Sequence, residues 1–192
     1  MKLKILLSLC ILFLLFACEN DSTQLPKALP IDGYYKITSM TSALPVDLDN
    51  NGVASKDMMS EIPEYFTNYS YDLYVRTIEH VNLNPMYQEH YVDFYLPHTD
   101  VNFDYPGASE GYSEFTRYGI SYGYQYNGND KEITIIRGEE AQELIDNVGR
   151  VDAVTVISEN RLEVILSKKY YDYTTSEWKS LVITIDYNKN VE

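Results

Sequence analysis

The residues best suited to bind a metal ion form the stretch Asp47-x-Asp49-x-Asn51-Gly52. Carboxylate and amide oxygens at the first, third and fifth positions, followed by a glycine that permits a sharp turn, are typical of loops that wrap around Ca²⁺. The backbone carbonyl of Val53, at the seventh position, could add another oxygen ligand. We therefore expect Asp47, Asp49 and Asn51 to be the candidate ligands of a calcium ion, and we expect no other cofactor.

The later part of this motif departs from the usual calcium loop. The twelfth position, where a bidentate glutamate normally completes the site, is Met58. Asp57 occupies the eleventh position and Glu61 lies beyond it, so a bidentate carboxylate would have to come from a different geometry. The alternative interpretation is an Asx-rich turn that leads to a helix cap at Ser55 or Asp57. Both interpretations stay open at this point.

Tyrosine is the second chemically distinctive residue type, with 19 copies against six phenylalanines and one tryptophan. In a predicted strand over residues 115–126, Tyr118, Tyr122 and Tyr124 share one face, and small residues occupy the other. A row of rings with hydroxyl groups can contact an apolar or amphipathic ligand, which makes these three tyrosines the candidate ligand-binding residues. The alternative is that the rings fill the core of the domain or stiffen its outer wall.

No group of residues predicts catalysis. Gly107-Ala108-Ser109-Glu110-Gly111 matches the Gly-x-Ser-x-Gly pattern of hydrolases, but it lies in a turn-rich segment without the strand before it and the helix after it that this chemistry needs. Of the three histidines, His80 and His90 would be diagonal neighbours about 7 Å apart, and His98 lies further along. Zinc needs all of its ligands about 2 Å from one point. We expect neither a zinc site nor an enzyme.

Length and charge limit the classes of protein to which the chain can belong. Its 192 residues suit one domain. The formal net charge is −14, from 29 acidic against 15 basic residues. This balance argues against nucleic-acid binding, because phosphate groups require clustered lysine and arginine.

The N-terminus has the pattern of a secretory signal. Lys2 and Lys4 precede an apolar run over residues 5–16, which is shorter than the roughly 20 residues that a spanning helix needs. The run ends at Ala17 and Cys18, and polar residues follow at once. This ending resembles the lipobox of bacterial lipoproteins. The resemblance implies that residues 1–17 are a cleaved signal peptide and that Cys18 carries acyl chains such as palmitate, which anchor the protein to a membrane.

Cleavage before Cys18 would change both the charge and the cysteine chemistry. It removes two of the 15 basic residues, so that 13 remain against 29 acidic ones and the net charge becomes −16. Cys10 is removed as well, which leaves no disulfide or zinc–thiolate chemistry to the folded part. Residues 18–30 then form the lipidated cysteine and a flexible tether. Glu19 resembles the start of lipoproteins sorted to the outer membrane, and the acidic start Glu19-Asn20-Asp21 resembles surface-export signals of Bacteroidota. We expect a cell-envelope location, at the outer membrane and exposed on the surface.

Beyond the tether, alternating apolar and polar residues predict strands separated by turn residues. The eight predicted strands cover residues 33–41, 68–81, 87–96, 115–126, 131–137, 150–158, 161–171 and 177–187. A long loop over residues 97–114 separates the third strand from the fourth. Apolar spacing also predicts two short helices, Glu139–Val148 with Gly149 as its stop and a weaker one over Ser55–Ile62 that ends before Pro63.

Eight strands joined by hairpins favour closure into an antiparallel up-and-down barrel, because closure removes exposed strand edges. The alternative is a two-sheet β-sandwich. Residues 33–37 (GYYKI) look like the Gly-x-aromatic start of lipocalins, and residues 46–57 resemble a segment of lipocalin-like lipoproteins of Bacteroidota, mainly flavobacteria. The resemblance implies that residues 31–192 form a lipocalin-like barrel that binds a small apolar or amphipathic ligand. The alternative function is a non-enzymatic envelope structural or protein-interaction module whose barrel is filled by its own side chains.

Overall fold

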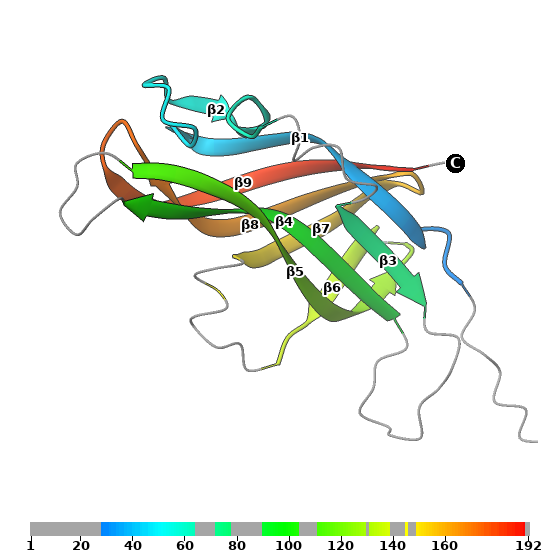
Figure 1. Ribbon diagram of the computed structural model, residues 1–192. Helices are drawn as coiled ribbons and strands as arrows, with labels where there is room; N and C mark the ends of the chain where they lie inside the picture. Colours follow the sequence, from blue (N-terminus) through cyan, green and yellow to red (C-terminus); the bar gives the residue numbers. More distant parts are fainter. Residues whose placement is uncertain are drawn as a thin grey trace, which may run out of the picture.

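Alternating strand patterns account for almost all of the regular structure in this chain. The computed structural model describes residues 28–63, 72–77, 90–103, 111–129, 131–138, 145 and 149–190. These residues form one 3-10 turn, η1 (Met58–Ser60), and nine strands (Figure 1). The strands are β1 (Gly33–Val46), β2 (Ser55–Asp57), β3 (Leu73–Thr77), β4 (His90–Phe103), β5 (Gly111–Asn127), β6 (Glu132–Ile136), β7 (Arg150–Ser158), β8 (Arg161–Asp172) and β9 (Glu177–Lys189).

The strands form a closed, eight-stranded, antiparallel barrel with up-and-down order. From β3 to β9 each strand pairs with the next one along the chain, and β1 pairs with both β3 and β9. The short strand β2 lies outside this ring and pairs with the second half of β1, with Thr41 opposite Asp57 and Val46 opposite Ser55. The pairing of β1 with β9 confirms the predicted barrel and overturns the alternative sandwich, which would have left these strands in separate sheets.

The period-two alternation of the strands places one face inside the barrel. On β8 and β9 every second residue from Leu162 and from Leu181 is buried, while Val182 on the opposite face is 51% exposed. Burial of each large apolar side chain contributes roughly 1.5–3 kcal/mol, so the inner face is the main source of stability.

A turn just before β1 closes one end of the barrel, which we call the sealed end. Ile31 is fully buried there, and the hydroxyl of Tyr35 donates hydrogen bonds to the carbonyl of Ile31 (2.7 Å) and to that of Glu159 (3.2 Å). The backbone N–H of Asp32 donates to the carbonyl of Leu29 at 2.9 Å and forms the turn. The opposite end, which we call the loop end, carries the β8–β9 hairpin and the segment between β1 and η1 (Figure 1).

The ring has a narrow seam between β1 and β3, where only Gly33–Tyr35 and Leu73–Val75 pair. Asp72 lies where this pairing ends and is only 7% exposed. Its Oδ2 accepts the N–H of Ile37 at 2.9 Å, and its Oδ1 accepts from Nη2 of Arg117 on β5 at 2.7 Å. One buried carboxylate therefore joins β1, the start of β3 and β5.

Two predictions about the local structure are wrong. The predicted loop over residues 97–114 is strand at both ends, because β4 continues through Pro97 to Phe103 and β5 begins at Gly111. The predicted helix over Ser55–Ile62 is instead the strand β2 followed by η1, with the Asp57 carboxylate accepting the N–H of Met59 at 3.1 Å. The pairing of β2 with β1 satisfies backbone groups that a helix would have paired internally.

Other predictions lie wholly or partly outside the described residues. Of the helix predicted over Glu139–Val148, only Ile145 is described, and its carbonyl accepts the N–H of Gly149 at 2.9 Å. The predicted signal peptide, residues 1–17, and the predicted anchor Cys18 also lie outside. Among the residues that the structure does describe, no helix combines the length and the apolar character needed to cross a bilayer.

Candidate functional site

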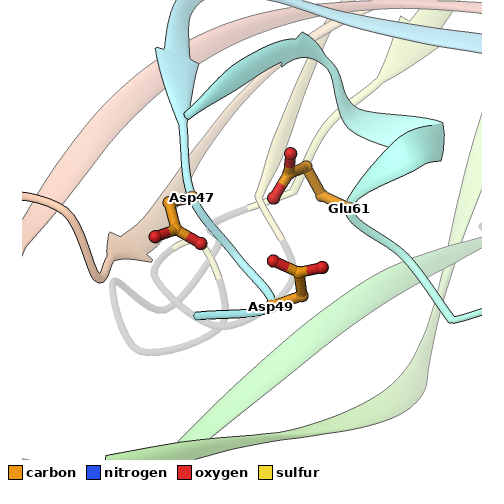
Figure 2. A group of neighbouring side chains, drawn as sticks. All are labelled: Asp47, Asp49 and Glu61. Atoms are coloured by element: carbon orange, nitrogen blue, oxygen red, sulfur yellow. The ribbon is translucent and has the colours of Figure 1, made fainter. Parts of the chain in front are cut away.

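The predicted calcium loop brings three carboxylates together at the loop end of the barrel. Asp47 directly follows β1, and Glu61 follows η1. Asp47, Asp49 and Glu61 each place one carboxylate oxygen within 4.8 Å of the others (Figure 2). Asp47 is fully buried and Glu61 is 3% exposed, whereas Asp49 is exposed. Glu61, which lies beyond the motif in the sequence, thus comes close to the two aspartates in space.

Backbone hydrogen bonds fold the loop around Asp47. Its carboxylate accepts the N–H groups of Asn51 (3.2 Å) and Gly52 (3.1 Å), and Gly52 has a positive φ of 83° that favours glycine. The side chain of Asn51 participates in the loop itself, since its Nδ2 donates to Asp49 at 3.0 Å and its Oδ1 accepts the N–H of Val53 at 2.8 Å. The structure therefore groups Asp47 and Asp49 as predicted, adds Glu61, and gives Asn51 a role in loop geometry.

The β8–β9 hairpin holds this loop in place. Asp172, at the end of β8, is fully buried and accepts the N–H of Asp47 at 2.8 Å. The hydroxyl of Thr174 donates to the Asp47 carboxylate at 3.1 Å, and Nζ of Lys179 lies 2.6 Å from Asp172 Oδ2. Burial alone would raise the pKa of Asp172, but hydrogen bonds from Lys179, Thr175 and the N–H of Asp47 hold this pKa below its ordinary value. Asp172 is thus a charged support for the loop.

The surroundings of Glu61 disfavour its ionised form. Burial raises the pKa of Glu61, and the neighbouring charges of Asp49 and Asp47 raise it further, against the N–H of Leu48 that lowers it. Like charges at this spacing favour either protonation or a bound cation. Oxygen ligands from two buried acidic residues and one exposed acidic residue fit a hard divalent cation such as Ca²⁺.

The structure separates the three candidate tyrosines of β5. Tyr122 and Tyr124 point into the barrel and are 6% and 1% exposed. Tyr118 follows the same alternation and pairs with buried Leu96, but it is 42% exposed. Its ring lies edge-on to that of His98, with 5.0 Å between the ring centroids. Two of the predicted residues therefore belong to the core, and the third lies at an accessible part of the inner face.

The small residues opposite this tyrosine row accommodate an aromatic side chain of the neighbouring strand. A Cβ atom on Gly119 would lie 3.1 Å from the ring of Tyr95, which is the cross-strand partner of Gly119 on β4. The absence of a side chain at Gly119 thus allows close packing on the outer face.

The sequence interpretation missed a charged residue inside the barrel. Lys168 lies on the inner face of β8 and is 4% exposed. Its Nζ is 3.4 Å from Nδ1 of His98 on β4, whose Nε2 is 3.1 Å from Oδ1 of Asp100. Burial lowers the pKa of Lys168 from 10.5 to about 7, while the charge of Asp100 raises it. The alternation of β8 from Leu162 onward would have placed Lys168 on the inner face.

Of the other residues singled out in the sequence, Ser109 and His80 lie outside the described part of the chain. His90 packs near Tyr124, with 5.5 Å between the ring centroids. Comparison with known proteins adds no assignment. No protein-family model, no curated protein and no solved structure matches this chain.

Proposed function

We propose that this chain is a membrane-anchored lipoprotein, held by acyl chains on Cys18 at the outer membrane, whose lipocalin-like barrel binds a small apolar or amphipathic ligand. The observation that supports binding is the position of Tyr118. It belongs to the inner face of the barrel, yet 42% of its surface is exposed. A ligand can therefore reach the inner face from solvent beside Tyr118.

The sealed end restricts where such a ligand fits. Tyr35, Tyr124 and Tyr187 are almost completely buried, and Ile31 closes that end. An eight-stranded barrel has room inside for its own side chains or for one small ligand. The ligand is accordingly small, and it binds in the half of the barrel that contains Tyr118.

Alanine substitutions of two tyrosines should have opposite effects on binding and stability. Tyr118→Ala should abolish retention of the ligand with little change in the free energy of unfolding, because Tyr118 is exposed. Tyr124→Ala should lower that free energy by about 3–5 kcal/mol, the usual cost of removing a buried aromatic side chain. Native mass spectrometry of protein purified from its own host envelope measures retention, and urea unfolding measures stability. Absence of any retained molecule, together with no binding of added amphiphiles, would refute the ligand-binding proposal.

A second function remains in competition because the interior holds many large side chains. The largest fully buried aromatic residues are Tyr35, Phe94, Tyr124, Tyr170 and Tyr187. A barrel filled in this way would serve as a non-enzymatic structural or protein-interaction module of the envelope. In that case Tyr118→Ala would change neither small-molecule binding nor stability.

We further propose that the loop at Asp47 binds Ca²⁺ through Asp47, Asp49 and Asn51, with Glu61 as an additional ligand. The convergence of Glu61 with Asp47 and Asp49 supports this assignment. The ion would relieve the repulsion among the carboxylates and fix the loop against the β8–β9 hairpin.

Calcium should raise the thermal stability of the protein through this loop. At a free Ca²⁺ concentration about 100 times the Kd, binding adds about 2.7 kcal/mol to the free energy of unfolding. Calorimetry with Ca²⁺ and with a chelator measures the difference. Glu61→Gln should remove most of it, whereas Glu177→Gln, at an exposed position of β9, should leave it intact. An identical melting temperature of the wild type with and without Ca²⁺ would rule the site out.

A further inference from the structure

The outer wall of the barrel beside the sealed end carries a row of aromatic rings and one arginine. The start of β1 and the end of β3 meet there (Figure 1), with Tyr34 opposite Tyr74, and Arg76 of β3 pairs with Tyr91 of β4. The rings of Tyr34 and Tyr74 are stacked with 4.3 Å between their centroids. The guanidinium group of Arg76 lies 5.9 Å from the ring centroid of Tyr74 and 5.4 Å from that of Tyr91. We call these four residues the tyrosine wall.

The tyrosine wall faces away from the core of the barrel. Its residues on β1 and β3 alternate with Tyr35 and Val75, which are fully buried. Tyr34 is 46% exposed, and 40% of the Arg76 side chain is exposed. A phenol ring combines an apolar face with a polar hydroxyl group, and tyrosine is accordingly enriched where a protein meets the boundary between lipid and water. The wall has the composition of such a boundary surface.

Charge makes the sealed end the more suitable one to approach a bilayer. Lys36 follows Tyr34 on the same face of β1, and Lys189 of β9 lies opposite the start of β1. The nearby acid Asp93 is paired with Arg76 at 2.9 Å, and the carboxylate of Asp32 accepts the N–H of Leu29 at 3.0 Å.

The loop end has the opposite balance of charge. Residues 47–61 and 172–179 carry two basic side chains, Lys56 and Lys179, and six acidic ones, which are Asp47, Asp49, Asp57, Glu61, Asp172 and Glu177. Anionic lipid headgroups attract lysine and arginine, so a surface with an excess of acidic groups is repelled. Of the two ends, the sealed end therefore fits a lipid surface better.

The tether proposed above reaches the barrel at this same end. The turn at Ile31 directly precedes β1, so residues 18–30 join the barrel close to Tyr34. This step rests on the acyl anchor proposed at Cys18. A flexible tether limits the distance between the barrel and the bilayer, but it transmits no direction. A wall that binds lipid at the same end would fix the orientation.

We propose that the tyrosine wall is a docking surface for the bilayer that holds the acyl anchor. The rings of Tyr34 and Tyr74 lie at the level of the lipid headgroups, and the flexible stem of Lys36 lets its ammonium group reach lipid phosphates. Weak contacts are sufficient for docking, because the anchor keeps the local concentration of lipid high.

The single tryptophan of the chain allows a direct test. Trp178 is 55% exposed and lies at the loop end, near the start of β9. A variant that combines Tyr34→Trp with Trp178→Phe moves the only indole to the tyrosine wall. Tyr91→Trp with Trp178→Phe is the second variant, for use if the first does not fold. Urea unfolding confirms that each protein is folded.

The proteins are purified with their acyl chains and placed in vesicles of phosphatidylethanolamine and phosphatidylglycerol. One set of vesicles carries bromine atoms on the acyl chains close to the headgroups, and these quench an indole on contact. Flotation of the vesicles measures attachment. The Tyr34→Trp variant should lose fluorescence in the brominated vesicles, whereas the wild type, whose indole lies at the loop end, should emit equally in both sets.

The outcomes separate the docking surface from the anchor. If the proteins do not float with the vesicles, the anchor at Cys18 fails and the docking surface fails with it. If they float but neither indole is quenched, or both are quenched equally, the anchor is supported and the docking surface is refuted. Quenching of Trp178 alone would place the loop end on the bilayer and would also refute the tyrosine wall as the docking surface.

Discussion

Replacing Asp72 with alanine is expected to lower the free energy of unfolding by about 3–5 kcal/mol, because the change breaks a buried ion pair. Arg117, whose side chain is only 16% exposed, would lose its carboxylate partner at 2.7 Å. The N–H of Ile37 would lose its acceptor at the point where β1 and β3 separate. A single substitution at this position therefore affects β1, β3 and β5 together.

Urea unfolding of Asp72→Ala, Arg117→Ala and the double variant measures this effect. The double variant should lose less than the sum of the two single losses, because the residues act as one unit. Arg150→Ala is the matched control. It breaks an ion pair with Asp152 of the same 2.7 Å length but with half of the arginine side chain exposed, and it should cost less than about 1 kcal/mol. Equal losses in Arg117→Ala and Arg150→Ala would show that the seam does not depend on the buried pair.

Lys168→Met is expected to stabilise the protein at pH 6 and to lose this advantage as the pH rises toward 10.5. Because burial lowers the folded-state pKa to about 7, the unfolded chain binds more protons between about pH 7 and 10.5, and wild-type stability rises with pH across that window. Displacement of the pKa from 10.5 to about 7 corresponds to roughly 5 kcal/mol, which is the upper limit of the gain. Methionine has a similar shape and no charge.

Urea unfolding at pH 6, 8 and 10 checks this prediction. The difference in stability between Lys168→Met and the wild type should shrink steadily as the pH rises. Lys169→Met, which removes an exposed charge from the same strand, should show no such trend. A constant difference between Lys168→Met and the wild type at all three pH values would mean that the buried amine does not titrate in this range.

The period-two pattern of the sequence predicted the strands well because half of each strand must face the interior. The predicted strand over residues 161–171 corresponds to β8 (Arg161–Asp172), and that over residues 177–187 corresponds to β9 (Glu177–Lys189). The pattern failed at Pro97, since proline usually ends a strand, whereas β4 continues through this position. It also failed over Ser55–Asp57, because a three-residue strand has too few residues to show an alternation.

The candidate sites were predicted only as far as local spacing could define them. The positions of Asp47 and Asp49 in one motif were enough to predict their convergence. Glu61 joins them through the pairing of β2 with β1 and the following 3-10 turn, which are long-range features without a signature in spacing. The contact between Lys168 and His98 joins residues that are 70 positions apart on strands that are not neighbours in the sheet. Closure of the barrel brings these two residues together across its interior.

The position of Ile31 at one end of β1 and of Asp47 at the other gives the molecule a defined polarity. Residues 18–31 can extend over about 45 Å at most. With the proposed anchor at Cys18, the connection to the bilayer would start from the side of Ile31 and Tyr35. The sealed end of the barrel would then face the bilayer, and Tyr118 would lie on the half directed away from the lipid. A molecule that enters beside Tyr118 would then come from the surrounding medium and not from the membrane to which the protein is attached.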